Sequence, residues 1–135
     1  MDTKKIIADF AMSPHIEGGH YKELWQSADT TRGRCLTSLI HYLLQQGERC
    51  KWHRLTSDEL WLFHRGAELT MVLGGSGDAP QEERRIDIGK ERFHLVVPAG
   101  TWQSALAQKG DVLVSCVVSP GYDSKDCEIY QGEAL

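Results

Sequence analysis

The 135-residue sequence has little of what several large classes of protein require. It lacks an excess of positive charge, because 15 Lys and Arg residues stand against 19 Asp and Glu, for a formal net charge of -4. Nucleic-acid-binding domains need a basic surface to neutralise phosphates, so we expect no nucleic-acid partner. No apolar run approaches the ~20 residues of a membrane-spanning helix, and the polar residues Asp2, Lys4 and Lys5 open the chain. We therefore expect a cytoplasmic protein with no membrane partner.

The sequence also lacks closely spaced cysteines and the short motifs of common enzymes. Cys35, Cys50, Cys116 and Cys127 are far apart, without the C-x-x-C spacing of zinc or dithiol sites. We expect reduced thiols without a functional role, with disulfides as the alternative. No P-loop, dinucleotide-binding glycine pattern or nucleophile elbow is present.

What the sequence does contain is a series of short apolar segments broken by turns. Ile6, Ile7 and Phe10 fall at helical spacing after Asp2, which predicts one short N-terminal helix that ends before Pro14. The remaining pattern favours an all-β sandwich or barrel, and the length suits a single domain over residues 1–135. The acidic tail after Tyr122 is weakly patterned and carries no expected strand. The expected strands cover residues 20–25, 34–44, 51–55, 59–64, 68–73, 83–88, 95–97, 103–106 and 112–118.

The segment from Gly47 to Gly66 contains the residues best suited to form a site. Side chains two residues apart on a strand share a face. If His53 points into the barrel, a neighbouring strand can direct Glu59, Trp61 and Phe63 to the same interior. An imidazole and a carboxylate among aromatic walls are typical of a small-molecule pocket. The alternative is that His53 and Glu59 are simply hydrogen-bonded groups of the barrel interior.

The same segment resembles a known family. Gly47, His53, Glu59 and Gly66 stand at the spacing of the first cupin motif, and residues 98–103, Pro-Ala-Gly-Thr-Trp-Gln, look like the start of the second. Over nearly its whole length the chain resembles a small cupin family of unknown function, sometimes called cupin family five. The runs that carry this resemblance are residues 15–21, 52–54, 57–66, 98–105 and 115–121.

The resemblance implies a double-stranded β-helix, or jelly roll, which agrees with the all-β pattern and the short N-terminal helix. It also implies a likeness in shape to the dTDP-sugar 3,5-epimerases. The family's own reaction is not established, so the resemblance does not decide whether the protein is an enzyme.

Two positions depart from the cupin motifs. Where the motifs place a second and a third histidine, this chain has Leu55 and Gln103. The interpretation we favour is therefore that no cofactor is present. The alternative is a divalent metal ion held by His53, Glu59 and Gln103, although an amide oxygen is a weak ligand, or by a set that His20 or His94 completes.

Three functions follow from these residues. The first is binding of a small molecule without chemistry. The second is a metal-independent sugar-nucleotide isomerase or epimerase, in which His53 or His20 removes a proton and Glu59 orients or returns it. The third, less favoured, is a metal-dependent enzyme. The expected ligand-binding residues are His53, Glu59, Gln103, Trp61, Phe63, Trp102 and Tyr21.

We also predict a homodimer. Apolar and aromatic residues exceed what one small barrel must bury, jelly rolls often pair through their sheets, and members of the resembled family commonly form dimers. Sedimentation of the purified protein at micromolar concentration should therefore give the mass of two chains. The mass of one chain would contradict this prediction.

Overall fold

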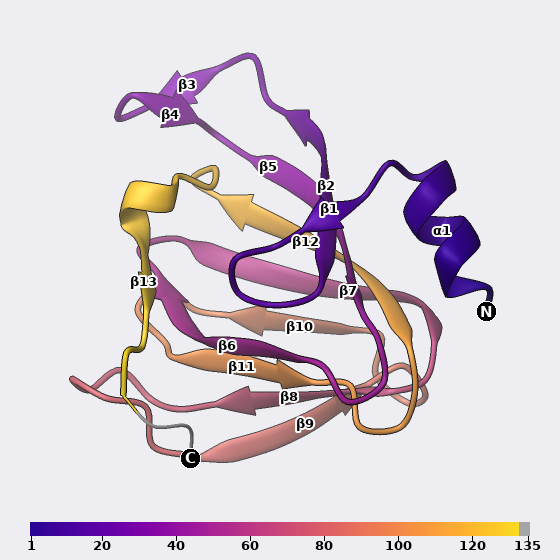
Figure 1. Ribbon diagram of the computed structural model, residues 1–135. Helices are drawn as coiled ribbons and strands as arrows, with labels where there is room; N and C mark the ends of the chain where they lie inside the picture. The colour runs from indigo at the N-terminus through magenta and orange to yellow at the C-terminus, as the bar shows by residue number, and fades with distance from the viewer. Residues whose placement is uncertain (133–135) are drawn as a thin grey trace.

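The computed structural model describes residues 1–132, which form two antiparallel sheets packed face to face (Figure 1). This arrangement confirms the predicted all-β jelly roll with one short N-terminal helix. The six-stranded sheet has the order β1 (Ser13–Pro14), β2 (His20–Gln26), β5 (Ser38–Leu44), β12 (Val112–Ser119), β7 (Asp58–Gly66) and β10 (His94–Val97). The five-stranded sheet has the order β13 (Cys127–Ile129), β6 (Arg49–Leu55), β11 (Gln103–Leu106), β8 (Leu69–Leu73) and β9 (Arg84–Ile88).

The helix α1 (Thr3–Asp9) covers part of the outer face of the six-stranded sheet. The Asp2 side chain caps it by accepting a hydrogen bond from the Lys5 backbone N–H. Its residue Ile6 packs with Leu43 of β5 and Leu113 of β12, both of which point away from the interior of the sandwich. None of the helices in residues 1–132 is long and apolar enough to cross a membrane.

Several parts of the chain differ from the predicted strands, and the two-residue strands β1 and β3 (Thr30–Thr31) lie outside all of them. The segment 34–44 is divided into β4 (Arg34–Cys35), which pairs with β3, and β5. Figure 1 shows the β3–β4 hairpin standing away from the two sheets. The tail after Tyr122 was expected to lack strands, but it forms a 3-10 turn, η1 (Ser124–Asp126), and then β13. Strand β13 is only three residues long and its stability comes from pairing with β6, so its own sequence gives little signal.

The interior of the sandwich is filled at one end and hollow at the other. Leu69, Met71 and Ile88 of the five-stranded sheet are completely buried in an apolar core that includes Val112 and Val114 of β12. Farther along the same strand β12, the inward residues Cys116 and Val118 line a cavity instead. The packed half stabilises the fold, and the hollow half is therefore free to hold a site.

A loop of residues 15–19, between β1 and β2, crosses from one sheet to the other at the hollow end. The Lys51 backbone N–H of β6 donates to the Glu17 carbonyl at 2.7 Å. At Gly18 the backbone has a φ of +111°, and a Cβ atom there would lie 2.2 Å from the Arg49 carbonyl oxygen. Only glycine permits this close approach in this conformation. The loop thus fixes Glu17 against β6.

We predict that Gly18→Ala lowers the free energy of unfolding by about 2–4 kcal/mol, from backbone strain together with the overlap on Arg49. The matched control is Gly47→Ala, where φ is +90° but no atom lies within 4 Å of the added Cβ. There the loss should be only about 1 kcal/mol. Urea unfolding measures both values, and equal losses in the two variants would contradict the packing argument.

Candidate functional site

A cavity of about 120 Å³ lies between the two sheets at the hollow end of the barrel. Its walls carry both ionisable and aromatic side chains, which is the composition expected of a ligand pocket. The ionisable members are His15, Glu17, Glu23, His53 and Glu59, and the aromatic ones are Tyr21, Tyr42, Trp61 and Tyr122.

His53 on β6 occupies the centre of the polar part of the site. Its Nδ1 donates a hydrogen bond to the Lys51 carbonyl at 2.9 Å, which leaves Nε2 directed toward two carboxylates. Nε2 lies 3.5 Å from Glu17 Oε2 and 3.7 Å from Glu59 Oε1. Burial by itself would lower the pKa of His53, but the facing Cys50, Glu17 and Glu59 outweigh burial and hold this pKa well above its usual value. The two carboxylates therefore favour the protonated form of His53.

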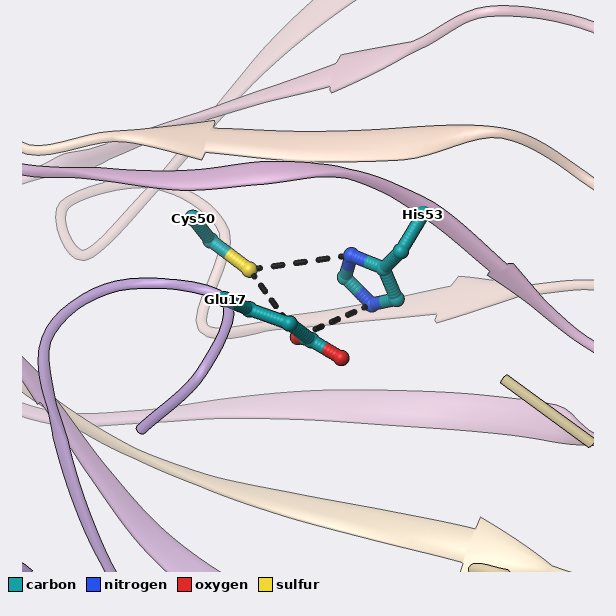
Figure 2. A group of neighbouring side chains, drawn as sticks. All are labelled: Glu17, Cys50 and His53. Carbon is teal, nitrogen blue, oxygen red and sulfur yellow. Dashed lines mark hydrogen bonds and ion pairs between the residues drawn. The ribbon is translucent and has the colours of Figure 1, made fainter. Parts of the chain in front are cut away.

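Cys50 and Glu17 join His53 in one buried group (Figure 2). The Cys50 thiol donates to Glu17 Oε2 at 3.3 Å and its sulfur lies 3.7 Å from His53 Nδ1. A second thiol, Cys127 of β13, donates to Glu17 Oε1 at 3.3 Å. Burial raises the pKa of Cys50 to about 11. Every oxygen of the Glu17 carboxylate thus has a donor.

An irregularity in β6 places Cys50 and His53 on the same face. Gln103 of β11 lies opposite His53, whereas Ala105 lies opposite Cys50, so β6 contains one more residue than β11 over this interval. Such a bulge changes the direction of a side chain and is common beside functional sites. Strict alternation would have placed residues 50 and 53 on opposite faces. Because of this bulge, Cys50 was not predicted as a site residue. Glu17 was not predicted either, because it lies on the loop of residues 15–19 rather than on a strand, although it falls within one of the family-like runs.

Gln103 orients the second carboxylate. Its Nε2 donates to Glu59 Oε1 at 2.9 Å, and its Oε1 accepts a hydrogen bond from Trp61 Nε1 at 2.7 Å. All three side chains are buried. Because the amide oxygen is already bonded to Trp61, Gln103 does not offer it to a metal ion. The structure assigns Gln103 the role of a positioning residue for Glu59.

The structure separates the other expected site residues into two groups. Tyr21 and Trp61 line the cavity, as do His53 and Glu59. Trp102 and Phe63 do not, and this corrects their expected place in the ligand wall. Trp102 packs with Trp52 on the far side of the five-stranded sheet, under Arg54, because alternation directs it away from its inward neighbour Gln103. Phe63 packs against Phe93 and the apolar core, so it lies in the filled half of the barrel.

The histidines considered as extra ligands do not reach the cavity. Tyr21 and Glu23 of β2 point into the cavity. His20 directly precedes Tyr21 on the same strand, so its side chain faces the opposite side of the sheet. His94 is exposed at the start of β10. His20 is therefore unsuited to remove a proton from a bound molecule, and neither residue completes a metal site with His53.

The sequence matches the family described as Cupin superfamily (DUF985) over residues 4–130. The chain belongs to this cupin family. Comparison with curated proteins finds no match. At the two motif positions that usually supply further histidine ligands, this cupin has Leu55, which lines the cavity without a donor atom, and Gln103, whose oxygen is engaged. The usual cupin metal set therefore does not fit these residues.

Solved structures resemble this chain over most of its length. A protein from Shewanella oneidensis is 33% identical, with a TM-score of 0.88 over 96% of this chain and 85% of that one. A hypothetical protein from Leishmania major is 29% identical, with a TM-score of 0.85 over 95% of this chain and 86% of that one. KdgF from Halomonas sp. is 20% identical, with a TM-score of 0.61 over 84% of this chain and 89% of that one, and this likeness shows the fold alone.

The role of Gln103 can be tested by replacing its amide with an apolar group of similar size. Gln103→Met leaves the Trp61 N–H without an acceptor and Glu59 without its donor, and it should lower the free energy of unfolding by about 2–4 kcal/mol. Gln46→Met is the control, because Gln46 is exposed and its side chain makes only a 3.5 Å contact with the Gln108 carbonyl. Urea unfolding followed by tryptophan fluorescence measures both. Wild-type stability in Gln103→Met would contradict the assigned role.

Proposed function

We propose that this cupin binds one polar end of a small molecule in the cavity between its two sheets. The observation that carries the proposal is the pair of buried carboxylates, Glu17 and Glu59, that converge with His53 on the cavity. Buried charged groups are costly to the fold and are more often retained where they serve a ligand.

The charge of the site favours a particular class of ligand. The polar cluster of Glu17, Glu59 and His53 sets two acidic side chains against one imidazole. A negatively charged group would be repelled at these short distances, whereas N–H or O–H donors and a positive charge would be attracted. The aromatic side chains of Tyr21 and Trp61 offer flat surfaces to a planar or cationic group. We therefore propose a ligand end that carries hydrogen-bond donors or a positive charge.

The size of the cavity supports binding of an end group rather than of a large molecule. Its volume of about 120 Å³ is only a few times the ~30 Å³ that one water occupies in the liquid. Glu23 and Gln26 of β2 also line it, and both are exposed, so the cavity opens to solvent along β2. The rest of a longer ligand would leave the cavity past these two residues.

A second candidate is metal-independent proton transfer, and the position of His53 between two carboxylates favours it. Because the pKa of His53 is raised, this residue is suited to donate the Nε2 proton to a carbonyl oxygen while Glu59 takes the proton from the adjacent carbon, which yields an enol. Return of a proton to either face of that carbon would complete an isomerisation or epimerisation. The likeness to dTDP-sugar 3,5-epimerases that the sequence suggested is an analogy of fold and supplies no substrate.

The homodimer is also a proposal. The pairing of β1 with β2 covers only His20 and Tyr21 on that edge. The rest of β2 is exposed and carries Trp25, which is 53% accessible. Free strand edges and exposed aromatic side chains are common at dimer contacts, so this edge is the surface on which we propose that a second copy binds.

Ligand binding can be tested with two variants of neighbouring residues. Val118 lines the cavity and Val117 faces the other side of the same strand. We predict that wild-type protein and Val117→Phe, incubated with a protein-free extract of small metabolites and then desalted, retain the same compound with donor or cationic groups in native mass spectrometry. Val118→Phe should lose it, because the larger side chain fills the cavity. Retention of nothing by the wild type, or equal retention by Val118→Phe, would contradict the proposal.

The retained compound also separates binding from proton transfer. If it contains a carbonyl with an adjacent C–H, incubation with wild-type protein in D₂O should introduce deuterium at that carbon, and Glu59→Gln should abolish the exchange. Absence of exchange with the wild type would leave binding as the function of the cavity and reject the second candidate.

A further inference from the structure

The group formed by Glu17, Cys50 and His53 lies outside the motif positions through which cupins usually bind metal ions, except for His53. One ligand atom from each residue lies within 4.8 Å of those from the other two (Figure 2). All three residues are buried. From this arrangement we infer that this cupin has a zinc site built by Glu17, Cys50 and His53, in place of the usual cupin ligand set that Leu55 and Gln103 do not supply.

The chemistry of the donors is that of zinc. A thiolate, an imidazole and a carboxylate are the three ligand types that zinc takes, whereas Mg²⁺ and Ca²⁺ prefer oxygen alone. With zinc–ligand bonds of about 2.0–2.3 Å, neighbouring ligand atoms of a tetrahedral site lie about 3.3–3.6 Å apart. Glu17 Oε2 lies 3.3 Å from Cys50 Sγ and 3.5 Å from His53 Nε2. The spacing of the two ligand pairs around Glu17 thus already fits a zinc ion.

The surrounding contacts orient the three ligands. A zinc-bound histidine usually donates its other ring N–H to a backbone carbonyl or a carboxylate, and His53 Nδ1 donates to the Lys51 carbonyl. The Cys127 thiol donates to Glu17 Oε1, which leaves Oε2 for the metal ion. The backbone of Glu17 is held by the Lys51 N–H. These contacts would hold the ligands in place before the ion arrives.

The fourth position of the site would face the cavity. Glu59 Oε1 lies 3.7 Å from His53 Nε2 and is held by Gln103, so it stands beside the trio. An open fourth position is typical of zinc sites that act on a bound molecule, whereas structural sites are closed by protein ligands.

The zinc inference rests on the distances among Glu17, Cys50 and His53, and it stands independently of the proposed function.

The zinc site can be tested with Co²⁺, which reports thiolate ligation through a charge-transfer absorption band in the near ultraviolet. Chelator-treated wild-type protein should bind one Co²⁺ per chain with this band, and zinc should displace the cobalt. Cys50→Ser should lose the band and bind zinc at least tenfold more weakly in calorimetric titration. Cys35→Ser is the control, because Cys35 lies outside the cavity, and it should keep both properties.

Two results would overturn the inference: the absence of a thiolate band in the wild type, or unchanged zinc affinity in Cys50→Ser. Circular dichroism of metal-free Cys50→Ser checks that the barrel is folded, and the wild-type spectrum tests the inference even if the variant is not. Retention of the metabolite by chelator-treated protein that shows no thiolate band would reject the zinc site alone. A thiolate band in protein that retains no metabolite would reject the proposed function alone.

Discussion

The structure depends on one constraint, which is the cost of placing two carboxylates and an imidazole between two apolar sheets. Each of these groups needs a partner, because an unpaired buried charge would destabilise the fold by several kcal/mol. Glu59 accepts a hydrogen bond from Gln103, and Gln103 accepts one from Trp61. Glu17 accepts hydrogen bonds from two thiols. The imidazole of His53 neutralises part of the negative charge. The polar half of the barrel is therefore a connected network rather than a set of separate residues.

Most of the fold could be predicted from the sequence, because it rests on local patterns. The alternation of apolar residues and the turn glycines predicted the strands of both sheets and the short helix, and the cupin resemblance predicted how they are arranged. The exceptions are the two-residue β1 and the three-residue β13, and β13 pairs with β6 through only Cys127, Glu128 and Ile129. A strand this short has no periodic signal of its own, and its position depends on a partner far away in the sequence.

The site could be predicted only in part, for reasons that differ among its residues. His53, Glu59 and Gln103 meet as expected because regular strands bring them to one interior. Trp102 was misplaced although the same alternation, applied to its neighbour Gln103, already directs it outward. Cys50 depends on a bulge in β6 and Glu17 on a loop, and no periodicity describes either. The two residues that most change the chemistry of the cavity are thus those that only the tertiary structure places.

The loop of residues 15–19 supplies one acidic side chain of the cavity, whereas the strands of the two sheets form the fold. Glu17 reaches the cavity from a connection outside both motif segments, and that connection is attached to β6 mainly through backbone groups. In a barrel built in this way, the residue at position 17 can change without changing the register of any strand. Relatives with the same sheets can therefore differ in what they accept by the sequence of five residues, and a shared fold would be a poor guide to a shared ligand.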